Sequence, residues 1–86
     1  MDEDWVSRHV VDAAVAIHKT LGPGLLESAY VAALEIELSE RQLHFVREAP
    51  VQGHYRGKPL GVVYRADLIV ENLVLIEAKA VQAIEP

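Results

Sequence analysis

The spacing of the apolar residues changes once along the chain, near Gln42, and this change limits the folds that the chain can adopt. Before Gln42, apolar side chains recur every three or four residues, as on one face of an α-helix. After it, they alternate or form short runs bounded by Gly, Pro and Asn, a pattern typical of β-strands. The order is therefore helices first and strands second, which indicates an α/β chain of the α+β type.

Two helices are predicted before the change. The first runs from about Trp5 to Leu21 and ends at Gly22, a residue suited to capping a helix. The second runs from about Leu25 to Arg41. Because the Gly-Pro-Gly break between them is short, we expect a helical hairpin or an angled pair. The predicted apolar rows are Val6, Val10, Ala13, Ala14, Ile17 and Leu21, then Leu26, Tyr30, Leu34 and Leu38.

Three strands in an antiparallel meander are predicted after the change. They run over residues 44–55, 60–70 and 73–80, and Pro50 suggests an edge or an irregularity in the first. A turn is expected at Arg56-Gly57-Lys58-Pro59. The unbroken Leu-Val-Leu-Ile start of the third strand predicts burial on both of its faces, as in a central strand.

One domain is expected over residues 1–86, and its end is unusual. Residues 81–86 read as the start of a further helix that the chain does not complete. Two helices alone would leave one face of a buried central strand short of cover. Either a truncated chain or a homodimer would explain this shortfall.

Composition excludes several classes of protein. The 51% share of hydrophobic residues argues against disorder, and the absence of cysteine excludes a disulfide framework and fits a reducing, cytoplasmic location. No apolar run is long enough to span a membrane, and the acidic N-terminus does not suit a secretory signal. The net charge of −5 argues against a general polyanion binder, unless some carboxylates hold a divalent cation.

Three charged residues lie inside the two apolar strands near the C-terminus. Glu77 and Lys79 are two residues apart, so they share one face of a strand. Asp67 shares that face in only one register. A two-residue turn would oppose Asp67 to Ile76, whereas a three-residue loop over 71–73 would oppose it to Glu77. The sequence does not choose between these registers.

A third acid, Glu27, lies in the first turn of the second predicted helix, beside its apolar row. Its carboxylate either interacts favourably with the helix dipole, which is the more common role, or lies close to the carboxylates of Asp67 and Glu77. Three converging carboxylates would suit Mg²⁺ or Mn²⁺, with Lys79 close to a metal-activated water. Such a site suits the hydrolysis of phosphodiesters.

The segment GLLESAY contains Gly24, Glu27 and Tyr30 in the pattern Gly-x-x-Glu-x-x-Tyr. With AIHKTLGPG before it and YRADLIVENLVLIEAKAV after it, the chain resembles the GxxExxY family of small prokaryotic proteins. That family is placed in the PD-(D/E)XK nuclease superfamily. The resemblance covers almost the whole chain, with three separated motifs in the right order.

The resemblance implies a restriction-endonuclease-like core and a Mg²⁺- or Mn²⁺-dependent nuclease, with DNA favoured over RNA as its partner. It implies that Asp67, Glu77 and the carbonyl of Ala78 bind the metal. Glu27 would be the acid from the helix, and Lys79 would serve the nucleophilic water.

Two further residues of the motif have supporting roles by the same resemblance. Gly24 would permit close entry of the helix, and Tyr30 would pack below the site. Members normally continue after the lysine with another helix and strand, so the resemblance implies a truncated core here.

Two alternatives stay open. The chain could be a catalytically inactive α/β dimerisation or binding module that keeps the nuclease fold. Arg56, Lys58 and Arg65 lie around the first predicted hairpin, where they could guide a phosphate backbone. A solvated turn explains Arg56 and Lys58 equally well.

Overall fold

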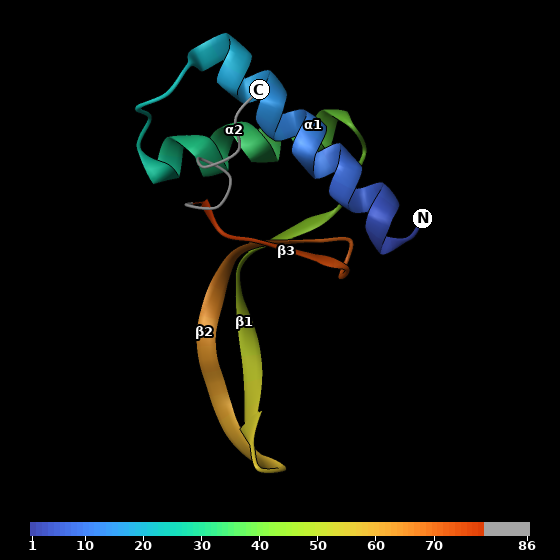
Figure 1. Ribbon diagram of the computed structural model, residues 1–86, viewed down its shortest axis with the longest axis vertical. Helices are drawn as coiled ribbons and strands as arrows, with labels where there is room; N and C mark the ends of the chain where they lie inside the picture. Colours follow the sequence, from blue (N-terminus) through green and yellow to red (C-terminus); the bar gives the residue numbers. More distant parts are fainter. Residues whose placement is uncertain (79–86) are drawn as a thin grey trace.

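The computed structural model describes residues 1–78 and shows two helices followed by a three-stranded sheet (Figure 1). This confirms the α+β order predicted from the sequence. The elements are α1 (Glu3–Leu21), α2 (Glu27–Glu40), β1 (Phe45–Tyr55), β2 (Lys58–Val70) and β3 (Val74–Ile76).

The ends of the helices follow from local hydrogen bonds. Asp2 precedes α1, and its Oδ1 accepts a hydrogen bond from the Trp5 amide at 2.9 Å. At the other end, the Gly22 amide donates to the His18 carbonyl at 2.9 Å, so the predicted glycine cap is confirmed. Leu26 lies just before α2 and is exposed, so its assignment to the apolar row was wrong. The row begins instead at Tyr30.

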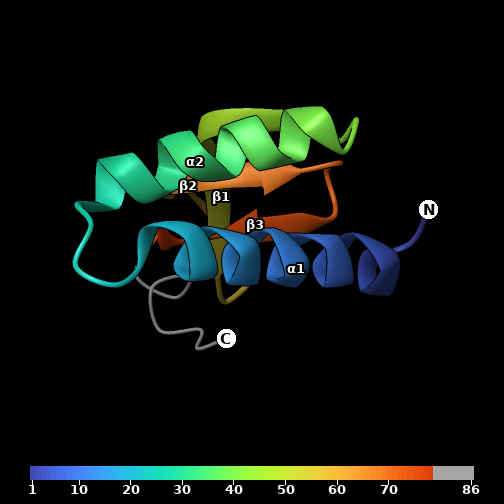
Figure 2. The same cartoon turned by 90° about the horizontal axis from the view of Figure 1, so that it is seen from above.

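The sheet is an antiparallel meander in the order β1-β2-β3. Burial of the third strand on both faces was predicted, and this prediction is wrong. β3 is a short edge strand, and Leu75 is 40% exposed while its neighbour Ile76 is 4% exposed. The reason is that α1 and α2 lie together on one side of the sheet, so they cover one face only (Figures 1 and 2). Residues 79–86, which include the end of the predicted third strand, lie outside the described residues.

The hydrophobic core lies between the helices and the covered face of the sheet. Both helices contribute one apolar row, and β2 contributes alternate residues, as expected for a strand with one buried face. The core residues are Val6, Val10, Ala13, Ala14, Ile17, Tyr30, Leu34, Leu38, Leu43, Leu68, Val70 and Ile76.

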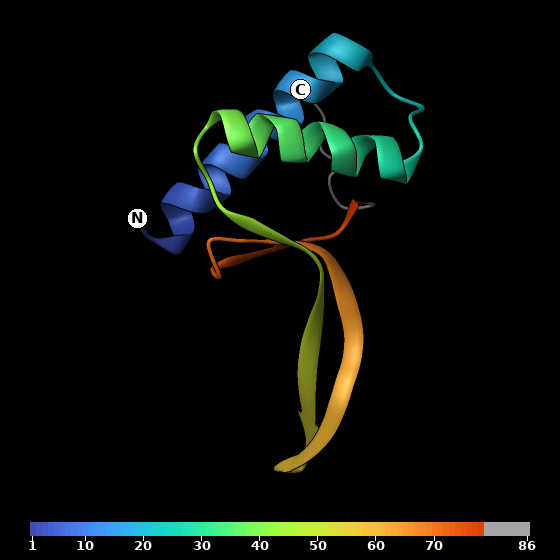
Figure 3. The same cartoon turned by 180° about the vertical axis from the view of Figure 1, so that it is seen from behind.

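Beyond the helices, β1 and β2 continue as a projecting two-stranded ribbon (Figures 1 and 3). We call residues 50–65 the hairpin arm. Its turn is Arg56-Gly57, where both residues have positive φ angles, 51° and 77°, as in the tight turns that suit a twisted hairpin. The predicted turn is thus confirmed at Arg56-Gly57, whereas Lys58 and Pro59, which were assigned to it, are the first residues of β2 and pair with Tyr55 and His54. The arm gives the molecule its elongated extents of 45 × 30 × 18 Å.

Candidate active site

The connection between β2 and β3 determines which side chains share a face. Val70 pairs with Val74, Ile69 with Leu75, and Leu68 with Ile76, so three residues, 71–73, form the connection. Two of these three, Glu71 and Asn72, have positive φ angles of 53° and 56°. Continuing the register by one residue opposes Asp67 to Glu77. Of the two registers that the sequence left open, the structure has this one.

The register places Asp67 on the face of the sheet that the helices leave uncovered, whereas Glu77 follows the last residue of β3, so the predicted third strand ends before Glu77. Leu68, which follows Asp67, is buried under the helices, and side chains alternate along a strand. Asp67 is half-buried, whereas Glu77 is exposed. Among residues 1–78, both carboxylates are therefore at least partly accessible to a ligand.

A hydrogen bond connects Asp67 directly to the segment that follows β3. The backbone amide of Ala78 donates to Asp67 Oδ2 at 2.7 Å. Because the acceptor is ionised, this bond is of the stronger, charge-assisted kind. It orients the Asp67 carboxylate toward the backbone of Glu77-Ala78. The sequence pattern does not reveal this contact, since it depends on the register of the hairpin.

The structure does not gather the three predicted acids into one group. Glu27 is the first residue of α2 and is exposed. The start of α2 and the end of β3 lie at the same end of the molecule (Figures 1 and 2). Within residues 1–78, however, no group of three His, Cys, Asp or Glu side chains is placed to hold a metal ion. Lys79 lies outside the described residues.

Comparison with known families identifies a family whose motif includes residues matching Asp67 and Glu77. The model of a family described as the PD-(D/E)XK nuclease superfamily matches residues 4–86. The chain belongs to this superfamily. Its name describes an aspartate followed by Asp/Glu-x-Lys, and in this chain Asp67 and Glu77-Ala78-Lys79 stand in that order. No curated protein and no solved structure matches the chain.

In this member of the PD-(D/E)XK nuclease superfamily, Tyr30 connects the two helices. Its side chain is buried, and its hydroxyl donates to the Gly22 carbonyl at 3.1 Å. The same hydroxyl lies 3.2 Å from His18 Nδ1, with the two rings 5.2 Å apart. Tyr30 therefore fixes the loop that leads from α1 to Glu27.

Gly24 lies in the loop before α2, where the resemblance implies that it permits a close approach of the helix. Among residues 1–78, apart from Gly24 and its two chain neighbours, no residue would have an atom within 4 Å of a Cβ atom on Gly24. Its φ angle is +89°, a conformation that other residues rarely adopt. The glycine thus allows a path of the backbone that other residues would strain.

One more carboxylate, which the sequence analysis missed, lies level with Asp67 in the sheet. Arg47 pairs with Leu68 and Ala49 with Ala66, so Glu48 stands opposite Asp67 on the β1 side. Glu48 has a φ angle of 47°, and the pairing skips this position. Between this pair of positions and the turn at Arg56-Gly57, the pairing of β1 with β2 has two register irregularities. Counting residues back from the turn in the sequence therefore does not reveal that Glu48 stands opposite Asp67.

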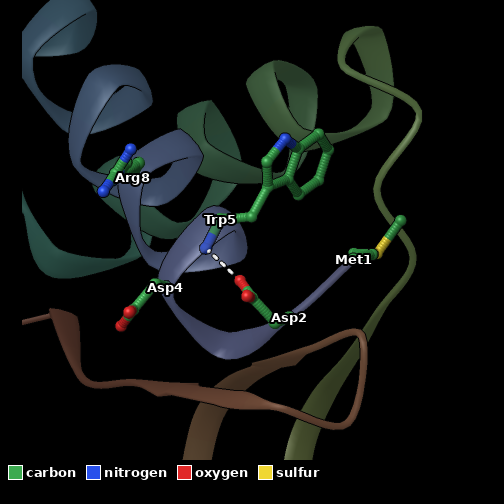
Figure 4. A pocket seen from close by; sticks show the side chains of 5 residues that line it. All are labelled: Met1, Asp2, Asp4, Trp5 and Arg8. Carbon is green, nitrogen blue, oxygen red and sulfur yellow. Dashed lines mark hydrogen bonds between the residues drawn. The ribbon is translucent and has the colours of Figure 1, made fainter.

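A hollow of about 580 Å³ at the start of α1 is a separate feature. It is lined by Met1, Asp2, Asp4, Trp5 and Arg8 (Figure 4). The start of α1 and the end of β3 lie at opposite ends of the molecule (Figure 1). The hollow is therefore not part of the candidate active site. No helix within residues 1–78 is long and apolar enough to cross a membrane.

Proposed function

We propose that the chain is a metal-dependent nuclease that hydrolyses phosphodiester bonds in nucleic acid. The observation that carries this proposal is the contact of Asp67 with the Glu77-Ala78 segment, through both the strand register and the 2.7 Å hydrogen bond. This contact supports a site in which Asp67 and Glu77, two carboxylates of the superfamily motif, act together.

The donor atoms of this face suit a hard divalent cation. If the β2–β3 register is continued by one residue beyond Leu68–Ile76, Asp67 and Glu77 stand opposite each other, and at the Cβ spacing of about 5 Å usual for such positions they would share one ion. The Ala78 amide occupies only one of the lone pairs of the Asp67 carboxylate. Mg²⁺ keeps several waters and needs only one or two protein carboxylates. Asp67 and Glu77 would therefore be enough, although no third acid joins them within residues 1–78.

Asp67 and Glu77 would hold the ion, with the Ala78 carbonyl as a further ligand. A bound Mg²⁺ or Mn²⁺ polarises the phosphoryl group and favours ionisation of the attacking water. Lys79 would offset phosphate charge and orient that water. Glu27, at the start of α2, would add a carboxylate from the same end of the molecule.

The proposal is tested by titrating Mn²⁺ into the chain in a calorimeter, with Asp67→Asn as the principal variant. Asparagine keeps an oxygen that can accept from the Ala78 amide, so the local structure should persist while the charge is lost. We expect Asp67→Asn to weaken Mn²⁺ binding by about 100-fold, at the upper end of effects measured around metal sites.

The matched control is Asp12→Asn, the same substitution at an exposed position of α1, which should bind Mn²⁺ like the parent chain. Lys79→Ala should retain Mn²⁺ binding but lose cleavage of plasmid DNA. A folded parent chain that binds no Mn²⁺ would contradict the nuclease proposal. A binding module that keeps the nuclease fold would then be the remaining function.

A further inference from the structure

The hairpin arm has a surface unlike that of the rest of the molecule. All residues from Lys58 to Arg65 are exposed, so the outer half of β2 buries no side chain in the core. The arm projects from the body with both of its faces open (Figures 1 and 3). A two-stranded ribbon gains little stability of its own, so this projection calls for a role outside the core.

The charge of the arm is opposite to that of the body. Residues 50–65 contain Arg56, Lys58 and Arg65 and no Asp or Glu, a formal charge of +3. The remaining five cations and thirteen acids give the rest of the chain a charge of −8. None of the ion pairs found among residues 1–78 includes a cation of the arm. The Arg56 guanidinium lies over the Tyr55 ring, 5.3 Å from its centre.

The arm is continuous with the candidate active site. Arg65 lies two residues before Asp67 on β2, and Ala66 between them is buried. By alternation, Arg65 and Asp67 are on the same open face. Asp67 lies nine positions after Lys58, which corresponds to about 30 Å of extended strand.

We propose that the hairpin arm binds in the major groove of duplex DNA, with Arg56, Lys58 and Arg65 contacting the phosphates that border it. The major groove of B-DNA admits a two-stranded β-ribbon, whereas the major groove of A-form RNA is too narrow for side chains to read. About 30 Å corresponds to roughly nine base pairs, close to one turn of the duplex. This inference rests on the proposed nuclease function and specifies duplex DNA as its substrate.

A second copy of the chain is a less suitable occupant. Two arms would bring three cations each and no acid, so they would repel one another. Pairing along the ribbon edges is hindered by Pro50, Pro59 and two register irregularities, features that protect strand edges. The proximity of Arg65 to Asp67 also favours an occupant that carries the phosphodiester to be cleaved.

The test is fluorescence anisotropy of a labelled 30-base-pair DNA duplex with the full chain in EDTA, so that binding is measured without metal or cleavage. The arm variant is Arg56→Gln/Lys58→Gln. The control variant, Arg8→Gln/Lys19→Gln, removes the same charge from exposed positions of α1. We expect the arm variant to lose at least about tenfold in affinity. The slope of log K against log salt should fall by about 2, since each phosphate contact contributes about 0.9. The control should bind like the parent chain.

Three results would overturn the inference: equal losses in the two variants, equal binding of duplex RNA and duplex DNA, or an arm variant that changes only the sedimentation of the chain. The last result would identify a second copy as the occupant.

Titration of Mn²⁺ into the arm variant separates the two proposals. Loss of DNA binding with normal Mn²⁺ binding supports both, whereas arm-dependent DNA binding without Mn²⁺ binding contradicts the nuclease proposal alone.

Discussion

The inner and outer halves of β2 differ in almost every physical respect, although they form one continuous strand. In the inner half, Ala66, Leu68 and Val70 are buried, and the last two belong to the core that the helices cover. In the outer half, every residue from Lys58 to Arg65 is exposed. Asp67 lies near the boundary between the halves. The candidate active site is thus positioned by the packed part of the strand and remains accessible from the exposed part.

The difference shows how one small chain can separate stability from recognition. Burial of apolar area stabilises the body, so substitutions there should lower the free energy of unfolding. The arm contributes little buried area, so truncation of its exposed side chains should leave unfolding almost unchanged. Matched substitutions in the two regions test this separation.

The largest effect is expected for Leu68→Ala compared with Leu60→Ala. Leu68 is 0% exposed in the core, and Leu60 is 59% exposed on the arm. Removing the Leu68 side chain leaves a cavity between sheet and helices, which should lower the free energy of unfolding by about 3 kcal/mol. Leu60→Ala should change it by less than about 0.5 kcal/mol. Urea unfolding followed by circular dichroism measures both.

Similar losses in these two variants would contradict the separation, because they would show that the arm is packed in solution. Val62→Ala, also on the exposed arm, serves as a second arm variant and should behave like Leu60→Ala.

An intermediate effect is expected for Tyr30→Phe compared with Tyr64→Phe. The first substitution removes the hydroxyl that donates to the part-buried carbonyl of Gly22, between the helices. It leaves the Gly22 carbonyl without this donor, at a cost of about 1–2 kcal/mol. Tyr64 is 48% exposed on the arm, and its hydroxyl can exchange hydrogen bonds with water. Tyr64→Phe should therefore unfold at the same urea concentration as the parent chain, and an equal shift in both variants would contradict the assignment.

The sequence predicts the helices and strands of this fold well, because residues close in the chain mark where an element ends or a turn begins. Gly22 ends α1 through its own amide, and Arg56-Gly57 forms the tight turn of the arm. The period of apolar residues then assigns helix or strand between such points. These features depend on neighbours in the chain, which the sequence displays directly.

Features that depend on distant neighbours could not be predicted in the same way. The apolar character of Leu75 suggested burial, but β3 lies at the edge of a sheet that is covered on one face. The register between β2 and β3 depends on the length of their connection, which is either the two residues Glu71-Asn72 or three residues, 71–73. Asn72 tolerates a positive φ angle in either case, so its identity does not decide between the two registers. Only the three-dimensional pairing shows that Asp67 meets the Ala78 amide.

The smallest effect concerns the shape of the arm itself, at Gly53. A Cβ atom on Gly53 would lie 2.6 Å from Val63 Cγ1, across the ribbon at a register irregularity. Valine is stiff about its first side-chain torsion, so Val63 cannot readily turn away. Gly53→Ala should therefore strain the ribbon, and Val63→Ala should relieve that strain.

A double-mutant cycle in urea should give a coupling of about 0.5–1 kcal/mol between Gly53→Ala and Val63→Ala. If the two free-energy changes simply add, the ribbon does not pack as described. If the coupling appears, the strained Gly53→Ala chain should also bind duplex DNA less tightly than the relieved double variant. That result would connect the curvature of the arm to its fit in the groove while the core stays unchanged.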